Sequence, residues 1–151
     1  MNETTLYTET ELAETHSFDG VRTGRSMAFF VDYAIVLTLS VPAALLLLLL
    51  GIPTLGLAWL AFPALVPLVA VLYVAMTMGG EQQATIGMRM NGLQAYKVGG
   101  GQIDKPLAGL HHILFLIIQG FGVFLPLLVS FVSPRKRLLH DIALGTYIAR
   151  A

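Results

Sequence analysis

The chain alternates between long apolar segments and short polar ones. No Asp, Glu, Lys or Arg occurs from Tyr33 to Gly80 or from Pro106 to Pro134. A helix needs about 20 apolar residues to cross the roughly 30 Å hydrocarbon layer of a bilayer, and a soluble core has no need for such uncharged runs. The pattern therefore predicts an all-α integral membrane protein.

Two transmembrane helices are predicted in the first apolar region. The first covers about residues 25–51 and the second about residues 55–78, and a turn rich in Gly and Pro lies between them. Pro63 and Pro67 are compatible with the second helix, because neighbouring helices can satisfy the carbonyl groups that a proline leaves free. So short a turn predicts that the two helices form an antiparallel hairpin.

The third apolar block, about residues 107–133, allows two paths. A single helix of this length would span about 40 Å at 1.5 Å per residue, which is long for a bilayer unless the helix is tilted. Gly120, Gly122 and Pro126 interrupt its middle. The block is either a third transmembrane helix or a re-entrant or interfacial hairpin of two short legs.

The polar segments differ in character. Residues 1–19 are acidic, rich in Thr and Glu and aperiodic, so we expect a disordered tail before a membrane domain at 20–151. The tail lacks the basic start and apolar centre of a secretory signal. The polar loop 79–106 is expected to hold a short β-hairpin that begins with "LQAYKV". The C-terminal segment 134–151 contains "GTYIAR", a second strand that could pair with "LQAYKV" in a small cytoplasmic cap.

The charge distribution favours one path for the third block. Formal net charge is zero, but all nine Lys and Arg residues follow the acidic tail. If the third block turns back, all nine lie on one side of the membrane; if it crosses, they divide five to four. Cytoplasmic loops of membrane proteins carry an excess of Lys and Arg. We therefore favour a membrane protein whose N-terminus and C-terminal segment are both cytoplasmic.

The basic residues also indicate which partners the chain contacts. The run Arg135, Lys136 and Arg137 is typical of a segment that contacts anionic lipid headgroups. No basic stretch is interleaved with aromatic residues, so nucleic acid is not an expected partner. Two or three helices do not easily enclose a transport pathway, which favours a homo- or hetero-oligomer.

Catalysis and metal binding find no support in the sequence. Cysteine is absent, and no Walker loop, G-x-S-x-G or H-E-x-x-H motif is present. His111 and His112 lie about 100° apart on a helix, so they are poorly placed to bind one metal, and we expect an interfacial position for them. We predict no enzyme, metal or cofactor.

Three residues of the first helix are candidates for ion chemistry. Arg25, Ala28 and Asp32 lie on one helical face, and the small Ala28 allows close packing there. Asp32 is the first acid inside an apolar run, and an ionisable group at that depth needs a partner. It is either a cation or proton site or, as we favour, an interfacial structural acid that is paired with a cation and fixes helix depth. We further expect Asp32 or Asp141 to meet Arg25 in a charge cluster.

His140 and Asp141 form a second candidate pair. Histidine titrates near neutral pH, so the pair could relay protons. Alternatively, and with more weight, Asp141 accepts local backbone N–H bonds while Gly145 allows a turn before Thr146.

These segments together resemble the RDD family of bacterial membrane proteins, named for one arginine and two aspartates. "RSMAFFVD" is similar to the family's R-x-x-A-x-x-x-D, "TIGMRMNGL" to its T-x-G-K loop, and "LHDIALGTYI" to its L-H-D-x-x-x-G-T ending. The matching residues are Arg25, Ala28, Asp32, Thr85, Gly87, His140, Asp141, Gly145 and Thr146. Two departures stand out: Met88 replaces the usual Lys, and His111 or His112 stands where an Arg often opens the third block.

The resemblance implies a multi-pass protein of the bacterial inner membrane and leaves two functions open. One is a small transporter or transporter subunit, in which Arg25, Asp32, Asp141 and His140 would handle protons or alkali cations. The alternative is a non-transporting scaffold or accessory protein whose Arg–Asp cluster is structural.

Overall fold

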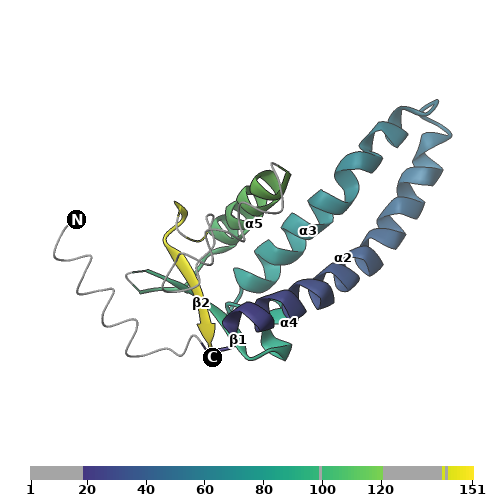
Figure 1. Ribbon diagram of the computed structural model, residues 1–151. Coiled ribbons are helices and arrows are strands. Elements are labelled where there is room, and N and C mark those ends of the chain that lie inside the picture. Colours follow the sequence, from purple (N-terminus) through teal and green to yellow (C-terminus); the bar gives the residue numbers. More distant parts are fainter. Residues whose placement is uncertain (1–18, 99, 121–140, 142) are drawn as a thin grey trace.

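The computed structural model describes residues 19–98, 100–120, 141 and 143–151 (Figure 1). Several predictions fall outside these residues, namely those for the tail up to residue 18, for the second half of the third apolar block, for His140, and for Arg135, Lys136 and Arg137.

Two long apolar helices form an antiparallel hairpin, as predicted. Helix α2 covers Val21–Gly51, and a turn leads to the 3₁₀-helix η1, Leu57–Ala61, and to helix α3, Phe62–Met78. The two helices run side by side from the base of the hairpin to its tip (Figure 1). Pro63 stands in the first turn of α3, where its missing N–H removes no helical hydrogen bond.

The length, composition and exposure of the two hairpin helices are those expected of helices in lipid. Val21–Gly51 and Leu57–Met78 are both long and apolar enough to cross a membrane. In their most apolar stretches only 17% and 11% of the residues are buried inside the protein. A core helix of a soluble protein would be mostly buried, whereas a helix that is apolar all round and remains exposed is expected in lipid.

The polar loop contains a helix that the sequence analysis did not predict. Helix α4, Ile86–Met90, starts at Thr85, whose side-chain oxygen accepts a hydrogen bond from the Met88 amide at 3.1 Å. A threonine in this position satisfies one of the free N–H groups at a helix start. Gly92, with φ 63°, then turns the chain from α4 into the first strand.

The sheet joins distant parts of the chain. Strand β1, Leu93–Lys97, pairs antiparallel with β2, Thr146–Arg150, which confirms the pairing of "LQAYKV" with "GTYIAR". The expected hairpin within residues 79–106 is wrong, because the partner strand comes from the far end of the chain. The residues after β1 are polar and Gly-rich, whereas β2 is buried from Thr146 to Ala149 and so provides the apolar partner that β1 requires.

Helix α5, Lys105–Gly120, follows and packs against α3. It begins beside Asp104, whose carboxylate accepts a hydrogen bond from the Leu107 amide at 3.0 Å. Gly109 faces α3 in ordinary van der Waals contact, since a Cβ there would lie 3.6 Å from the Ala75 Cβ. The helix covers the first half of the predicted 107–133 block.

The core lies at the base of the hairpin, where the cap meets it. We use "cap" for α4, β1 and β2, which lie at the end of the hairpin opposite the turn at residues 52–56 (Figure 1). Leu93 of β1 and Ile103 are each 1% exposed, and Leu93 packs against Gly24 of α2. Polar and apolar contacts therefore concentrate at this one end of the molecule.

Candidate functional site

Asp32 is held by donors from two other elements. Its Oδ1 accepts hydrogen bonds from the Tyr73 hydroxyl of α3 at 2.6 Å and from the Gly87 amide of α4 at 2.8 Å. Its Oδ2 accepts one from the hydroxyl of Thr85 at 2.6 Å. The Tyr73 oxygen also accepts a hydrogen bond from the Ile86 amide at 3.1 Å. One carboxylate thus joins α2, α3 and the start of α4.

Small residues make this arrangement possible. A Cβ at Gly87 would lie 2.3 Å from the Ala28 carbonyl oxygen and 2.8 Å from the Asp32 Cγ. Ala28, at 3% exposed, is the α2 residue over which α4 packs. The predicted close packing at Ala28 is therefore present, and α4 is the element that approaches there.

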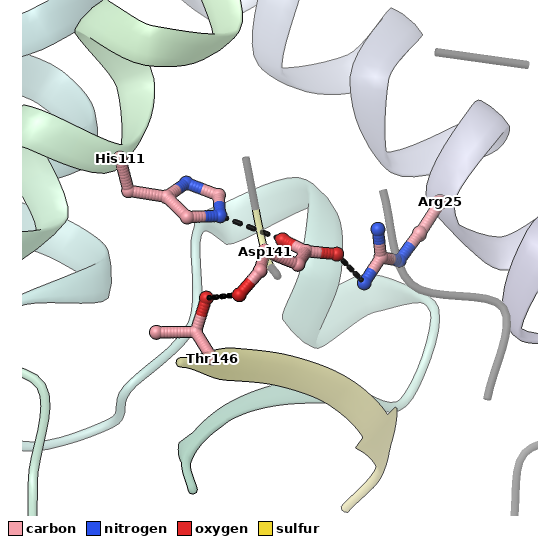
Figure 2. Close-up of polar contacts among 4 residues, drawn as sticks. All are labelled: Arg25, His111, Asp141 and Thr146. Atoms are coloured by element: carbon pink, nitrogen blue, oxygen red, sulfur yellow. Dashed lines mark hydrogen bonds and ion pairs between the residues drawn. The ribbon is translucent and has the colours of Figure 1, made fainter. Parts of the chain in front are cut away.

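Asp141 forms the second cluster and is fully buried. Its Oδ2 lies 2.6 Å from Arg25 Nη2, and its Oδ1 lies 2.7 Å from His111 Nε2 (Figure 2). The Thr146 hydroxyl donates to the Asp141 backbone carbonyl at 3.5 Å. The ion pair joins α2 to the C-terminal segment just before β2. His111 joins α5 to the same carboxylate.

The structure answers the question of which aspartate meets Arg25. The ion pair forms with Asp141, so the predicted contact between Arg25 and one of the two aspartates is confirmed. Asp32 belongs to the separate cluster with Tyr73, about two turns further along α2, and among the described residues its partners are hydroxyl and amide groups, so the expected pairing with a cation is wrong. Gly145, with φ 61°, forms the turn before β2, and its carbonyl accepts a hydrogen bond from the Val98 amide at 2.7 Å.

Sequence reasoning missed two members of these clusters. Tyr73 lies in an uncharged run, and the available signal was its hydroxyl, because a buried tyrosine normally finds a hydrogen-bond partner. His111 was assigned only an interfacial position. The signal for its role was its place in the chain, because it stands where the resemblance led us to expect an arginine.

The neighbouring His112 has a different environment. Its ring stacks on Phe115 with centroids 5.5 Å apart. The helix that carries it, α5, is not one of the two candidate membrane spans. Burial, and to a lesser degree the adjacent His111, lower the pKa of His112 from its ordinary value of 6.5 to about 4. His112 is therefore neutral at physiological pH.

The chemistry available to the site follows from these contacts. Arg25 binds Asp141 through Nη2, while its buried Nε has no hydrogen-bond partner among the residues that the structure describes. Within the described residues no group of three or more His, Cys, Asp or Glu side chains is placed to hold a metal ion. Both carboxylates accept hydrogen bonds from elements distant in sequence, so the site fixes the cap to the hairpin.

Two exposed apolar helices, joined near their base by the hydrogen bond between Tyr73 and Asp32, define a helical protein of the membrane type. The chain belongs to the RDD family, whose model matches residues 21–145. This match confirms the resemblance drawn from the three motifs. Neither the curated proteins nor the solved structures contain a significant match.

Proposed function

We propose that this RDD protein is an inner-membrane scaffold or accessory protein, in which the two carboxylate clusters hold a cytoplasmic cap against a membrane hairpin. The cap would present a fixed surface to a partner subunit, either a second copy or another membrane protein. The proposal assigns the chain no catalytic activity. It places anionic lipid headgroups around the basic residues at the base of the hairpin.

The observation that carries the proposal is the set of hydrogen bonds that the Asp32 carboxylate accepts. Three donors from the chain surround its carboxylate, at 2.6, 2.6 and 2.8 Å. A carboxylate that binds and releases a cation must give up such bonds in each cycle. Hydrogen bonds to charged groups contribute about 1.5–3 kcal/mol each, so their repeated loss would be costly. The geometry therefore favours a structural role.

The orientation of the proposal rests on the cations. Among the described residues, Arg22, Arg25, Arg89, Lys97, Lys105 and Arg150 all belong to the cap or to the adjoining ends of the helices. The opposite turn carries no charge. By the positive-inside rule, this distribution supports a cytoplasmic cap and a cytoplasmic N-terminus.

The sheet supports one of the two paths for the third block. β1 precedes this block and β2 follows it, yet the two strands pair directly. The Arg150 Nε also donates to the Asp19 carbonyl at 3.1 Å, beside the start of α2. Strands that share a sheet lie on the same side of a membrane, which supports a block that turns back over a single crossing.

The test is an Asp32→Asn variant, compared with wild type for assembly and for proton and alkali-cation flux. A structural role predicts that detergent-extracted Asp32→Asn has a lower melting temperature and loses its native oligomer. Thr77→Val is the matched control, because it removes a hydroxyl that donates a hydrogen bond inside α3, to the Tyr73 carbonyl at 2.7 Å. An Asp32→Asn variant that assembles normally but loses a wild-type flux would refute the scaffold proposal.

Proton-linked transport is the second candidate, and one observation favours it. His111 contacts a fully buried carboxylate that also binds Arg25. Histidine and carboxylate side chains form the proton relays of many membrane pumps and transporters, and here the two lie in direct contact. Flux in proteoliposomes under proton, sodium and potassium gradients tests this, with Arg25→Gln, Asp141→Asn and His111→Gln as variants. Absence of wild-type flux under every gradient would exclude it.

A further inference from the structure

The tip of the hairpin, residues 52–60, is apolar and exposed. It contains no Asp, Glu, Lys or Arg. The most exposed large side chains of this segment are Leu55 at 97%, Leu60 at 76%, Ile52 at 72% and Leu57 at 69%. Leu55 also adopts a φ of 51°, a conformation that leucine seldom adopts and that glycine or asparagine would adopt more readily. A turn that projects into water would not be expected to place leucine there.

The tip also satisfies its own backbone. Every amide from Ile52 to Trp59 has an acceptor within the chain, except that of Pro53, which has no N–H. Six of these bonds go to backbone carbonyls, for example Gly56 to Gly51 at 2.7 Å. Water would satisfy such amides without internal bonds. In hydrocarbon no water is present, so each backbone donor must find its acceptor inside the protein.

The polar side chains of the tip also form their hydrogen bonds inside the protein. The Thr54 hydroxyl donates to the Leu50 carbonyl at 2.6 Å and accepts a hydrogen bond from the Ala58 amide at 3.1 Å. The Trp59 indole N–H donates to the Leu48 carbonyl at 3.3 Å. Gly51 makes room for this ring, since a Cβ there would lie 1.7 Å from the indole nitrogen.

The length of the hairpin places the tip at the depth of lipid. If the polar groups around Asp32 mark the boundary on the cap side, α2 extends about 28 Å from Asp32 to Gly51 at 1.5 Å per residue. The return path from Leu57 to Tyr73 covers about 27 Å through η1 and α3. The hydrocarbon layer is about 30 Å thick, so neither helix carries the turn beyond it.

We propose that residues 52–60 form a lipid-contacting surface within the leaflet opposite the cap, so that the hairpin tip does not enter the adjacent aqueous phase. Ile52, Leu55 and Leu57 contact acyl chains there. The Trp59 ring reaches back to the Leu48 carbonyl, so it lies among the upper acyl chains, slightly deeper than Leu55. The inference does not depend on which function the cap performs.

Trp59 provides the first test, because it is the only tryptophan in the chain. Wild-type protein is reconstituted in vesicles of phosphatidylcholine with bromine at defined acyl positions, and its fluorescence is compared with that in vesicles without bromine. We expect quenching by bromine near the carbonyl end of the acyl chain and little quenching by aqueous iodide. Strong quenching by iodide would place the tip in water and overturn the proposal. Protection from both quenchers would mean that protein covers the tip, and would also overturn it.

Cysteine labelling provides an independent test, because the chain has no cysteine of its own. Leu55→Cys is compared with Gln102→Cys, an exposed position in the loop between β1 and α5. The vesicles are permeabilised so that the reagent reaches both faces of the membrane. A membrane-impermeant maleimide should label Leu55→Cys at about one tenth of the rate of Gln102→Cys, or more slowly still, because an apolar environment disfavours the reactive thiolate. Equal rates would overturn the proposal. Leu57→Cys replaces Leu55→Cys if the latter does not fold, and both should label fully in denaturant.

Discussion

Gly87 donates its backbone N–H to the Asp32 carboxylate at 2.8 Å, across 55 positions of sequence. The contact requires glycine, because a Cβ at residue 87 would lie 2.3 Å from the Ala28 carbonyl oxygen. The bond and the missing side chain bring Gly87 together with Ala28 and Asp32, which belong to a different motif, in one contact between α2 and α4.

Gly87→Ala should therefore destabilise the protein by about 1–3 kcal/mol, the usual cost of overpacking a core. Thermal unfolding in detergent, followed by circular dichroism, measures the change. Gly109→Ala is the control: it also lies in a helix, but its added Cβ would be 3.6 Å from the nearest heavy atom. Equal melting temperatures for the two variants would contradict the close approach at Gly87.

Tyr73→Phe should cost about 1.5–3 kcal/mol, since it removes a hydrogen bond to an ionised carboxylate and leaves the Ile86 amide without its acceptor. Tyr33→Phe is the matched control, because Tyr33 is half exposed and stacks on Phe29 through its ring. Its effect should stay within about 0.5 kcal/mol. Chemical denaturation of both variants distinguishes the two positions, and a neutral Tyr73→Phe would rule out the assigned bond.

Arg25→Met should destabilise the protein by about 3–5 kcal/mol, because it leaves the buried Asp141 charge without its arginine. Lys105→Met, at an exposed cation, should be near neutral. The double variant Arg25→Met with Asp141→Leu should recover stability, since replacing both partners removes the uncompensated charge. The melting temperatures of the four proteins give the comparison. A double variant that is less stable than Arg25→Met alone would show that the pair has another role.

The His112 environment predicts a pH dependence. Its pKa of about 4 in the folded protein lies below the ordinary 6.5, so the unfolded chain binds more protons between these values. Stability should then fall as the pH falls from about 6.5 to about 4, and remain unaffected by this group above that range. His112→Phe keeps the ring beside Phe115 and should lose less stability than wild type between pH 7 and pH 4.5. Parallel melting curves against pH would argue against a buried neutral His112.

The β1–β2 register predicts a specific cross-link. Ala95 and Ile148 are direct partners, so Ala95→Cys with Ile148→Cys should form a disulfide in a chain that has no other cysteine. Gln94→Cys with Ile148→Cys is the control, because residues one position apart on a strand point to opposite faces. Non-reducing gel electrophoresis after mild oxidation shows the product. Efficient cross-linking of the control pair would mean that the register is different.

The sequence was sufficient for the hairpin because a bilayer imposes a simple requirement. Uncharged runs of about 20 residues have few alternatives, and the turn between α2 and α3 was visible as glycine and proline. The strands were found in the same way, from short β-branched and aromatic runs. Their pairing was predicted in two incompatible forms, and the long-range one is present because only β2 offers an apolar partner.

The site was only partly predictable, since its contacts depend on the packing of elements far apart in the chain. The Arg25–Asp141 pair was among the expected contacts because buried charges need partners. The role of Tyr73 required the position of α3 relative to α2, and helix α4 was too short for its periodicity to be recognised. His111 was placed correctly at the start of a helix, but nothing local indicated that it would meet Asp141.

The order of synthesis gives the β1–β2 pair a further consequence. A ribosome completes β1 well before Thr146–Arg150 emerge, so β1 has no partner strand while the residues between the two strands are synthesised. During that interval its unpaired edge is open to other chains, a known aggregation hazard. Translation products that stop before residue 146 keep this edge unpaired, so they should aggregate more readily than chains that contain β2.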